Sequence, residues 1–338
     1  MDNLKVVIVA FMGSVILTGL LRSYAIRRAM LDVPNERSSH TRPTPRGGGL
    51  AIVATFIAVL SFMFTRDLFS PPFFLAMSLG GLSVAVIGFW DDHGHVPPCW
   101  RILVHFAAAG WALYCLGGVF SFRPGHAFYD IDIGWLADAG GAVLIVWMLN
   151  LYNFMDGIDG IAAVEAICVA GGAAAIMWLN GGSSQLLLLL GLAAGCLGFL
   201  VWNWPPAKIF MGDAGSGFLG FVLCLFALSD YGGTGMNLWS WMILSGIFVV
   251  DATVTLVRRI CRGERFYLAH RSHAYQILSR RFDSHLTVTL GTLVINIVWL
   301  MPFAFLAARY SEYAIVFLVI SLMPIVWGAV RAGAGTAS

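Results

Sequence analysis

Apolar windows separated by short polar segments repeat along the whole chain. A helix that crosses a bilayer needs about 20 mostly apolar residues, because lipid offers the backbone no hydrogen-bond partner. Eleven such windows predict an all-α integral membrane protein with about eleven transmembrane helices, and their short connections predict one polytopic domain over residues 1–338. The windows lie near residues 4–22, 47–65, 72–90, 101–119, 136–153, 158–179, 185–204, 216–231, 238–257, 286–307 and 314–330.

One predicted outer loop departs from this helical pattern. Residues 120–135 include FYDIDIG, in which polar and apolar side chains alternate. Alternation over a few residues is typical of a strand. A short β-hairpin or interfacial strand is therefore predicted here, on the periplasmic side.

The composition fits a membrane protein and excludes most soluble classes. Hydrophobic residues make up 59% of the chain, charged residues 11%, and the mean hydropathy is +0.82. The six cysteines are scattered without a CxxC pair, so neither disulfides nor a zinc site are expected. No nucleic-acid-binding module occurs, and DNA or RNA is not an expected partner.

Lysine and arginine indicate the orientation, because they concentrate in the cytoplasmic loops of membrane proteins. With the N-terminus outside, sixteen of the 20 Lys and Arg residues fall on the inner side and four on the outer side. This asymmetry predicts an external N-terminus and a cytoplasmic C-terminus. The first window lacks a basic leader and a cleavage site and is followed by Arg22, Arg27 and Arg28, so it is predicted to be a retained span rather than a signal peptide.

The unusual polar segments all fall on the predicted cytoplasmic side. A one-sided set of carboxylates, amides and cations suits an enzyme that handles a phosphorylated substrate at a membrane face. The main alternative, a secondary transporter for a phosphorylated or acidic solute, predicts repeated halves and broken helices with charge at the midplane, and the sequence indicates neither. The polar segments are residues 35–49, 91–95, 150–160, 203–217 and 258–281.

Near the predicted midplane the main ionisable residues are Glu165, His105 and Asp251. Asp251 precedes Arg258 by seven residues, which places it about 10 Å along a helix from the inner interface. Its carboxylate is expected either to border the cytoplasmic site or to pair with a neighbouring helix.

Adjacent carboxylates, Asp91 and Asp92, follow the third window. Such a pair repels unless a cation or a proton lies between the two groups, so it is suited to bind magnesium or to accept a proton. The sequence DDHG is also suited to a solvated turn.

The segment NLYNFMDGIDG places Asn150, Asn153, Asp156 and Asp159 between two apolar windows. If a helix begins here, the two acids share one face near its N-terminus. Amides can bind a sugar or a nucleobase, and carboxylates can bind a ribose or a metal. The alternative is a helix cap followed by an acidic first turn.

The segment KIFMGDAGSG, which includes Lys208 and Asp213, precedes the eighth window. Gly212, Gly215 and Gly217 allow a backbone to approach a phosphate, and a helix start offers free N–H groups to it. The P-loop pattern GxxxxGK[ST] is absent, which excludes the soluble NTPase class of that type. The alternative is a glycine-rich turn in which Asp213 caps the helix.

The segment LAHRSHAYQ carries His270, Arg271 and His273 within an arginine-rich loop. No nearby cysteine or HExxH spacing supports zinc. A cationic cluster that binds phosphate fits better. A loop that only orients the protein in the membrane explains the arginines but not the paired histidines.

In combination these motifs resemble the polyprenyl-phosphate N-acetylhexosamine-1-phosphate transferase superfamily, which includes MraY and WecA, and most closely its WecA/WbpL branch. The resemblance runs in order from about residue 32 to residue 281. The paired acids of the family match Asp91 and Asp92, and its FMGDxGS motif matches residues 210–216. Its NxxNxxDGxDG motif matches Asn150, Asn153, Asp156 and Asp159.

The resemblance implies a reaction at the cytoplasmic face of a bacterial inner membrane. A UDP-N-acetylhexosamine would donate its sugar 1-phosphate to undecaprenyl phosphate and release UMP, which would initiate an O-antigen or lipopolysaccharide-type envelope polysaccharide. Magnesium is the implied cofactor, with manganese as a substitute. Small-residue stretches in the helices also permit a homodimer.

The resemblance also implies roles for the matched residues. Asp213 would ligate magnesium with Asp92, and Asp91 or Asp92 would receive a proton or orient the lipid phosphate, while a covalent route with Asp213 as nucleophile stays open. The histidine motif departs from the family, since Ala274 and Tyr275 follow His273, so the choice of sugar stays open. The expected substrate-binding residues are Asn150, Asn153, Asp156, Asp159, Lys208, His270, Arg271 and His273.

Overall fold

The computed structural model describes residues 3–34, 42–94, 96–119, 135–229, 235–264 and 270–336. Helices dominate these residues, which confirms the predicted all-α membrane fold class. Long apolar runs form helices because a helix satisfies its backbone hydrogen bonds within the segment.

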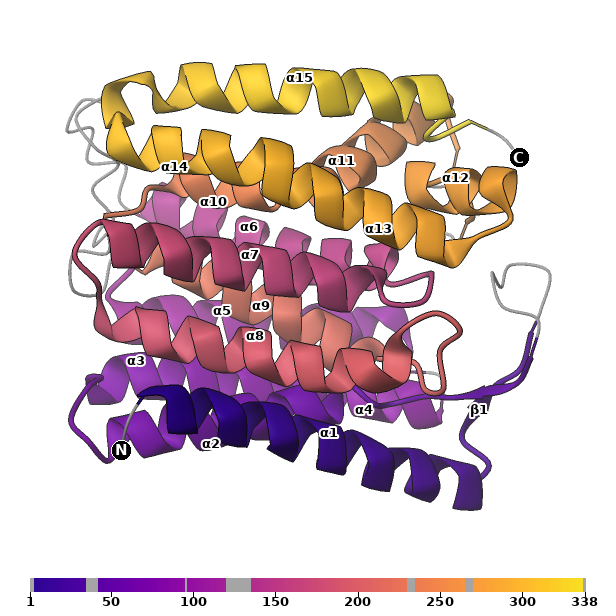
Figure 1. Cartoon of the computed structure of the whole chain (residues 1–338), viewed down its shortest axis with the longest axis horizontal. Helices are drawn as coiled ribbons and strands as arrows, with labels where there is room; N and C mark the ends of the chain where they lie inside the picture. Colours follow the sequence, from indigo (N-terminus) through magenta and orange to yellow (C-terminus); the bar gives the residue numbers. More distant parts are fainter. Residues whose placement is uncertain are drawn as a thin grey trace.

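The helices carry the labels of Figure 1. They are α1 (Asn3–Arg27), α2 (Leu50–Phe64), α3 (Pro71–Leu75), α4 (Gly81–His93), α5 (Pro98–Leu116), α6 (Trp135–Met155), α7 (Ile161–Leu179), α8 (Ser184–Asn203), α9 (Asp213–Leu228), α10 (Leu238–Leu244), α11 (Gly246–Cys261), α12 (Ala274–Phe282), α13 (His285–Ile295), α14 (Met301–Arg309) and α15 (Ala314–Ala332). Three short segments of other helix types join them: the π-helices η1 (Ala76–Gly80) and η3 (Asn296–Leu300) and the 3₁₀-helix η4 (Ser311–Tyr313).

Two very short strands lie between α1 and α2. β1 (Leu31–Asp32) pairs antiparallel with β2 (Thr44–Pro45). A strand of two residues carries no readable periodicity, so the sequence pattern does not predict this pair. The hairpin predicted at residues 120–135 lies outside the described residues, except that Trp135 begins α6.

All eleven apolar windows overlap helical segments in the described part of the chain. Among the described residues, eight helical segments are long and apolar enough to cross a membrane, and α10 with α11 makes a ninth if the two count as one span. The apolar helices α2 and α9 are shorter. The number of spans, the external N-terminus and the single domain therefore stay predictions.

Helices α10 and α11 are bent by 80° relative to one another at Ser245. The sequence-based expectation of unbroken helices is wrong at this point. Both arms of the break are apolar, so hydropathy does not reveal it. The pair Ser245 and Gly246 is the local signal, because sharp kinks occur at Gly/Ser pairs.

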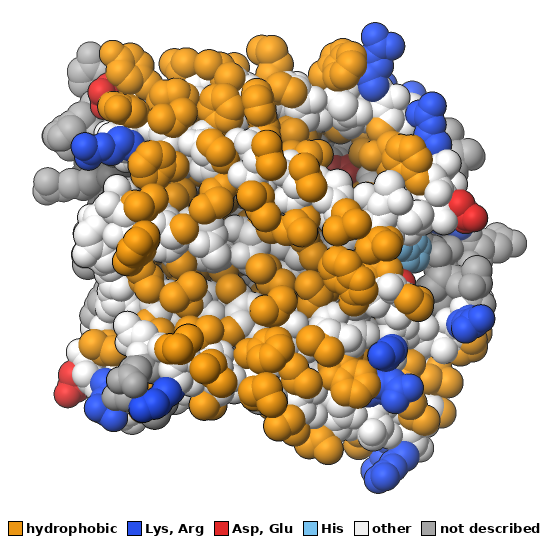
Figure 2. All heavy atoms as spheres, in the orientation of Figure 1, with side chains coloured by type: hydrophobic (Ala, Val, Ile, Leu, Met, Phe, Trp, Pro, Cys, Tyr) orange, Lys and Arg blue, Asp and Glu red, His pale blue; other side chains and the backbone are white. Residues whose placement is uncertain are grey.

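The long helices lie side by side, with the two chain ends at opposite ends of the bundle (Figure 1). Figure 2 shows hydrophobic side chains across the middle of one face, and Lys, Arg, Asp and Glu side chains toward its two ends. Large exposed apolar side chains, such as Leu4 and Val298, are what a lipid-facing surface requires.

Helix α9 lies at the centre of the bundle. Nearly all of its residues are buried, and it packs against α2, α4 and α6. Gly88, Gly215 and Gly220 allow this, because a Cβ atom at each would overlap backbone of a neighbouring segment. For Gly215 that neighbour is Gly49, at the start of α2. The glycine that the sequence suggested for phosphate approach thus serves helix packing.

Candidate active site

Three aspartates and two arginines meet where α4, α5 and α9 converge. Asp213 pairs through Oδ1 with Nη2 of Arg46 at 2.5 Å and through Oδ2 with Nη2 of Arg101 at 2.9 Å. Nε of Arg46 also lies 2.7 Å from Oδ1 of Asp92, and Nη1 of Arg101 lies 2.5 Å from Oδ2 of Asp91. These five residues form what we call the acid–arginine cluster. The structure thus brings together the three acids that the sequence proposed as catalytic.

Asp92 holds the first turn of α9. Its Oδ1 accepts a hydrogen bond from the N–H of Asp213 at 3.0 Å, and its Oδ2 accepts one from the N–H of Ala214 at 3.3 Å. Gly212 adopts a φ of +79° and leaves room for this carboxylate, because a Cβ atom there would overlap Oδ2. The N–H groups that the sequence predicted to face a phosphate are therefore bonded to Asp92, which is a stabilising partner for a helix N-terminus.

The neighbouring Asp91 differs from Asp92 in its accessibility. Oδ1 of Asp91 accepts a hydrogen bond from the N–H of Val96 at 2.9 Å, and its side chain is 12% exposed. The side chain of Asp92 has no exposed surface. Of the two adjacent acids, Asp91 is therefore the one whose side chain keeps exposed surface.

Arg46 is positioned by backbone pairing between two segments that are distant in sequence. The N–H of Phe210 donates to the carbonyl of Pro45 at 2.8 Å, and the N–H of Gly48 donates to the carbonyl of Phe210 at 2.9 Å. Arg46 therefore lies opposite the segment that carries Asp213. Burial alone would lower the pKa of Arg46, but the nearby carboxylates raise it above its ordinary value, so Arg46 is a permanent cation.

The two asparagines of α6 reach different partners. Nδ2 of Asn153 donates to Oγ of Ser216 in α9 at 3.4 Å, which places this amide beside the acid–arginine cluster. Nδ2 of Asn150 donates to the carbonyl of Val146 at 2.7 Å, so this bond stays within α6.

Asp156 and Asp159 lie in the loop before α7, which begins at Ile161, so the helix start that would place both acids on one face does not occur at this segment. Burial and the negative charges of neighbouring aspartates raise the pKa of Asp156 to about 7, although Arg46 acts in the opposite direction. Oδ2 of Asp159 instead accepts a hydrogen bond from the N–H of Ala207 at 3.0 Å and lies 3.3 Å from Nδ1 of His285. The loop thus directs its two acids to different surroundings.

Lys208 is exposed and contacts an aromatic ring. Its Nζ lies 5.8 Å from the ring centre of Trp202, and its carbonyl accepts a hydrogen bond from Nε of Arg22 at 3.2 Å. The ammonium group is therefore placed over Trp202 rather than in an ion pair with the cluster.

The two histidine rings of the LAHRSHAYQ segment stack, with the centres of His270 and His273 separated by 5.0 Å. Nδ1 of His273 lies 3.3 Å from Oδ1 of Asp251. Burial and neighbouring positive charges lower the pKa of His270 to about 4. The His270 ring is therefore neutral at pH 7, whereas the sequence suggested a cation. The carbonyl of Arg271 accepts a hydrogen bond from Nη2 of Arg280 at 3.0 Å.

A cavity of about 450 Å³ lies beside the acid–arginine cluster. Arg46, Asp92 and His93 line it together with Tyr24 of α1 and Arg28, which follows this helix. Guanidinium groups bind phosphate oxygens through paired hydrogen bonds. The cavity can therefore admit an anionic group as far as the cluster.

The cluster has the donor chemistry that magnesium prefers. Mg²⁺ is commonly held by one or two carboxylates together with substrate phosphates, rather than by a cage of protein ligands. Within the described residues, no group of three or more His, Cys, Asp or Glu side chains is placed to hold a metal alone. Asp213 and Asp92 each already pair with a cation. Asp213 keeps exposed surface and fits an ion that is shared with substrate phosphates, whereas both oxygens of Asp92 are bonded to backbone N–H groups.

Sequence reasoning missed Arg46 and Arg101 as members of the site. Both were counted only among the basic residues of cytoplasmic loops, where arginine is expected for orientation alone. The available signal was their position: Arg46 directly precedes the glycine run GGG, and Arg101 follows Asp91 closely.

Comparisons with known proteins support the motif-based resemblance. The family model described as "Glycosyl transferase family 4" matches residues 74–230. A phospho-N-acetylmuramoyl-pentapeptide-transferase of Shouchella clausii is 30% identical, over 81% of this chain and 89% of that protein. A probable undecaprenyl-phosphate N-acetylglucosaminyl 1-phosphate transferase of Bacillus subtilis is 29% identical, over 94% of this chain and 89% of that protein. A decaprenyl-phosphate N-acetylglucosaminephosphotransferase of Mycobacterium tuberculosis is 28% identical, over 86% of this chain and 78% of that protein.

Proposed function

The chain belongs to glycosyl transferase family 4, in the superfamily that includes MraY and WecA, and from this premise we propose its reaction. We propose that it transfers an N-acetylhexosamine 1-phosphate from a UDP-sugar to undecaprenyl phosphate, which gives the undecaprenyl-diphosphate-sugar and UMP. The relatives support the coarser part of this statement, since their names describe sugar 1-phosphate transfer involving polyprenyl phosphates.

The observation that carries the proposal is the double ion pair of Asp213 with Arg46 and Arg101. The reaction brings together a diphosphate and a monophosphate, which repel one another. Two guanidinium groups on one carboxylate provide cations that can bind both partners, and electrostatic stabilisation of this kind supplies most of the catalysis in phosphoryl transfer.

The two adjacent acids take different roles in the proposed mechanism. Asp92 is fully buried and accepts backbone hydrogen bonds from α9, so it positions Asp213. Asp91 keeps exposed surface and is the group that receives the proton of the lipid phosphate. Geometry and access come before pKa in the assignment of a general base.

We propose a direct displacement rather than a covalent route through Asp213. Both carboxylate oxygens of Asp213 pair with cations in this structure, and a carboxylate that holds arginine or magnesium is a poor nucleophile. An oxygen of the lipid phosphate therefore forms a bond to the β-phosphorus of the donor. The bond from that phosphorus to the bridging oxygen breaks, and UMP leaves with the electron pair.

Asp213 would hold magnesium, with Asp92 beside it fixing its position, and the ion would neutralise charge on the donor diphosphate when bound. Asn153 and Asp156 lie beside the same cluster and are proposed to bind the donor. Asn150, Asp159 and Lys208 have other partners and remain candidates for the same task. Among the expected phosphate-binding residues of the last polar segment, Arg271 supplies a guanidinium group, which can bind phosphate oxygens through paired hydrogen bonds.

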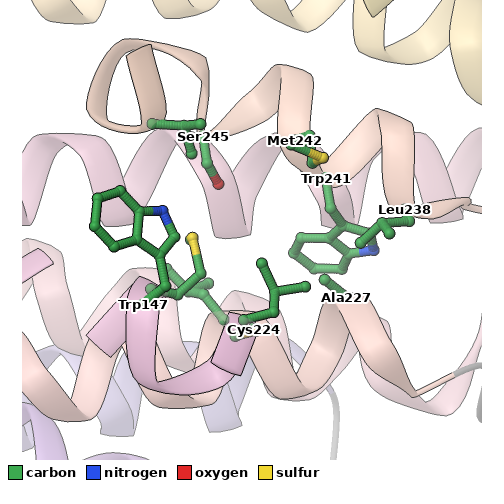
Figure 3. Close-up of a pocket in the computed structure, with 11 residues that line it drawn as sticks. Trp147, Cys224, Ala227, Leu238, Trp241, Met242 and Ser245 are labelled. Carbon is green, nitrogen blue, oxygen red and sulfur yellow. The ribbon is translucent and has the colours of Figure 1, made fainter. Parts of the chain in front are cut away.

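The lipid tail is proposed to lie along α9. An apolar pocket between α6, α9 and the bend at Ser245 is lined by Trp147, Cys224 and Trp241 (Figure 3). Cys224 follows Asp213 in α9 by a distance of about 16 Å along the helix axis. A lipid whose phosphate reaches the cluster can therefore place part of its tail in this pocket.

The cellular setting is also part of the proposal. We place the protein in a bacterial inner membrane with the acid–arginine cluster on the cytoplasmic side, where UDP-sugars occur. The product would initiate an envelope polysaccharide of the O-antigen type. The relatives' names refer to N-acetylglucosamine and N-acetylmuramoyl-pentapeptide and do not specify that polysaccharide.

Purified protein, undecaprenyl phosphate, magnesium and a panel of labelled UDP-N-acetylhexosamines test the reaction. We expect labelled lipid and UMP to form in equal amounts with at least one donor, and chelation of divalent cations to stop the reaction. Vesicles that contain the same protein distinguish the transferase from the alternative, a secondary transporter. Uptake of a phosphorylated solute without release of UMP would replace the proposal by a transporter.

A further inference from the structure

Helix α12 is attached at its start to helix α11 of the bundle. Oδ1 of Asp251 accepts a hydrogen bond from the N–H of Ala274 at 2.8 Å, and Oδ2 accepts one from the N–H of Tyr275 at 2.9 Å. Oδ1 also lies 3.3 Å from Nδ1 of His273. Asp251 is 5% exposed, so few water molecules compete for these bonds. The start of α12 is therefore fixed relative to α11.

The side chain of Tyr275 joins α12 to the loop that carries Asp156. Its hydroxyl donates to the carbonyl of Phe154 at 2.9 Å. This carbonyl lies in the last turn of α6, where carbonyl groups lack a partner within the helix. The same hydroxyl lies directly against Gly157, since a Cβ atom at Gly157 would overlap it. Tyr275 thus contacts the chain on both sides of Asp156.

We propose that Tyr275 is a positioning residue for donor binding: its hydroxyl fixes residues 154–157, and Asp251 fixes the helix that carries it. This inference rests on the proposed function, because it assigns the loop around Asp156 to the UDP-sugar. Tyr275 does not touch the acid–arginine cluster through any of the hydrogen bonds described for it. It acts through the position of Asp156.

The physical chemistry of the contact supports a specific task for the hydroxyl. Tyr275 is 3% exposed, and burial raises its pKa well above the ordinary value, so the hydroxyl stays a hydrogen-bond donor at neutral pH. Its loss would leave the carbonyl of Phe154 without this partner, and the loop would lose a fixed contact beside Asp156. A more flexible loop binds the donor more weakly, because the conformational entropy lost when the loop becomes ordered then opposes binding.

The first test removes only the hydroxyl. We expect Tyr275→Phe to raise the KM for the UDP-sugar about tenfold, which corresponds to the loss of one hydrogen bond of about 1.4 kcal/mol. The KM for undecaprenyl phosphate should not change. Tyr152→Phe is the matched control, because the hydroxyl of Tyr152 is buried and has no hydrogen-bond partner among the described residues. This variant should keep both KM values.

The second test uses the contact with Gly157. This glycine is not among the described residues with positive φ, so Gly157→Ala tests the space beside Tyr275 rather than the backbone. We expect Gly157→Ala to lower the melting temperature and raise the donor KM. The double variant Gly157→Ala/Tyr275→Phe should recover part of both losses, because the overlapping hydroxyl is gone. Such recovery is a coupling between the two sites that independent defects would not produce.

The outcomes distinguish this inference from the proposed function. If the wild-type protein releases no UMP with any donor, the proposed function is wrong, and the inference about donor binding goes with it. If the wild-type protein is active and Tyr275→Phe behaves like Tyr152→Phe, the positioning role is wrong while the proposed function stands. Equal changes in both KM values would also overturn the role, since they indicate a general loss of structure.

Discussion

Asp92 and Asp251 make the same hydrogen bonds in two different regions of the molecule. Each comes from a helix of the bundle, and each accepts the first two N–H groups of another helix, α9 in one case and α12 in the other. Both are largely or fully buried. The two carboxylates are therefore equivalent as helix caps.

Their surroundings differ in charge. Beside Asp92 lie Arg46 and Asp213, which belong to a network of four ion pairs with the remaining members of the cluster. Beside Asp251 lie His273 and the hydroxyl of Thr255. A helix cap does not require such a network of ion pairs. The additional charged side chains around Asp92 therefore indicate a candidate active site. Asp92 thus supports the proposed reaction centre, whereas Asp251 supports a neighbouring helix.

The largest expected effect is at Asp213. Asp213→Asn removes the charge that orders both arginines, and we expect the rate of UMP release to fall by about 10³. The melting temperature should change little, because the amide keeps the shape of the side chain. Initial rates and thermal unfolding in detergent measure the two effects. A rate near that of the wild type would exclude Asp213 from the mechanism. The functional difference between the two regions would then have no support.

Replacement of the two capping acids tests the comparison directly. Asp92→Ala and Asp251→Ala each remove both acceptors of a helix cap, and we expect each to lower the free energy of unfolding by about 1–2 kcal/mol. Only Asp92→Ala should also reduce kcat strongly, whereas Asp251→Ala should act mainly on the KM for the UDP-sugar.

Kinetics and unfolding curves for the same two samples measure this difference. A fall in kcat of similar size in both variants would mean that the two regions are not functionally distinct.

The remaining effects concern the pH dependence of stability, and they have opposite signs in the two regions. The raised pKa of Asp156, about 7, means that the folded protein keeps a proton which the unfolded chain releases near pH 4. Asp156 therefore costs stability as pH rises from about 4 to about 7. The lowered pKa of His270, about 4, means that the unfolded chain takes up a proton first, so His270 costs stability as pH falls from about 6.5 to about 4.

Melting temperatures of two variants across this range test the opposite signs. Relative to the wild type, Asp156→Asn should gain stability at pH 7 and above, and His270→Gln should gain stability near pH 4. Parallel curves for wild type and variant would show that the groups titrate alike in the folded and unfolded states.

The apolar windows and the proximity of Asp91, Asp92 and Asp213 could be predicted from the sequence. The windows depend on composition alone. The proximity depends on topology, because connections that alternate between two membrane faces bring distant polar segments to one end of the bundle. Neither inference requires knowledge of how side chains pack.

The remaining features depend on tertiary contacts that a single sequence does not encode locally. Gly215 allows two backbones to touch, and no pattern distinguishes such a glycine from one that faces a phosphate. Asp159 lies in a non-periodic loop, where spacing does not predict the direction of a side chain. Arg46 was not predicted as a site residue, because the positive-inside rule already accounted for an arginine in a cytoplasmic loop. The bend at Ser245 was not predicted, because the helices on both sides of it are apolar and hydropathy does not change there.

The length of α9 has a consequence for how the two substrates meet. Its 16 residues rise about 24 Å, which is less than the hydrocarbon thickness of about 30 Å. A helix of this length that starts at Asp213 leaves its first residue below the headgroup level when its other end reaches the opposite interface. In the proposed reaction, the water-soluble donor would then have to bind below the headgroup level, close to the depth of the lipid phosphate. Bilayer thickness would in that case affect how the two proposed substrates meet.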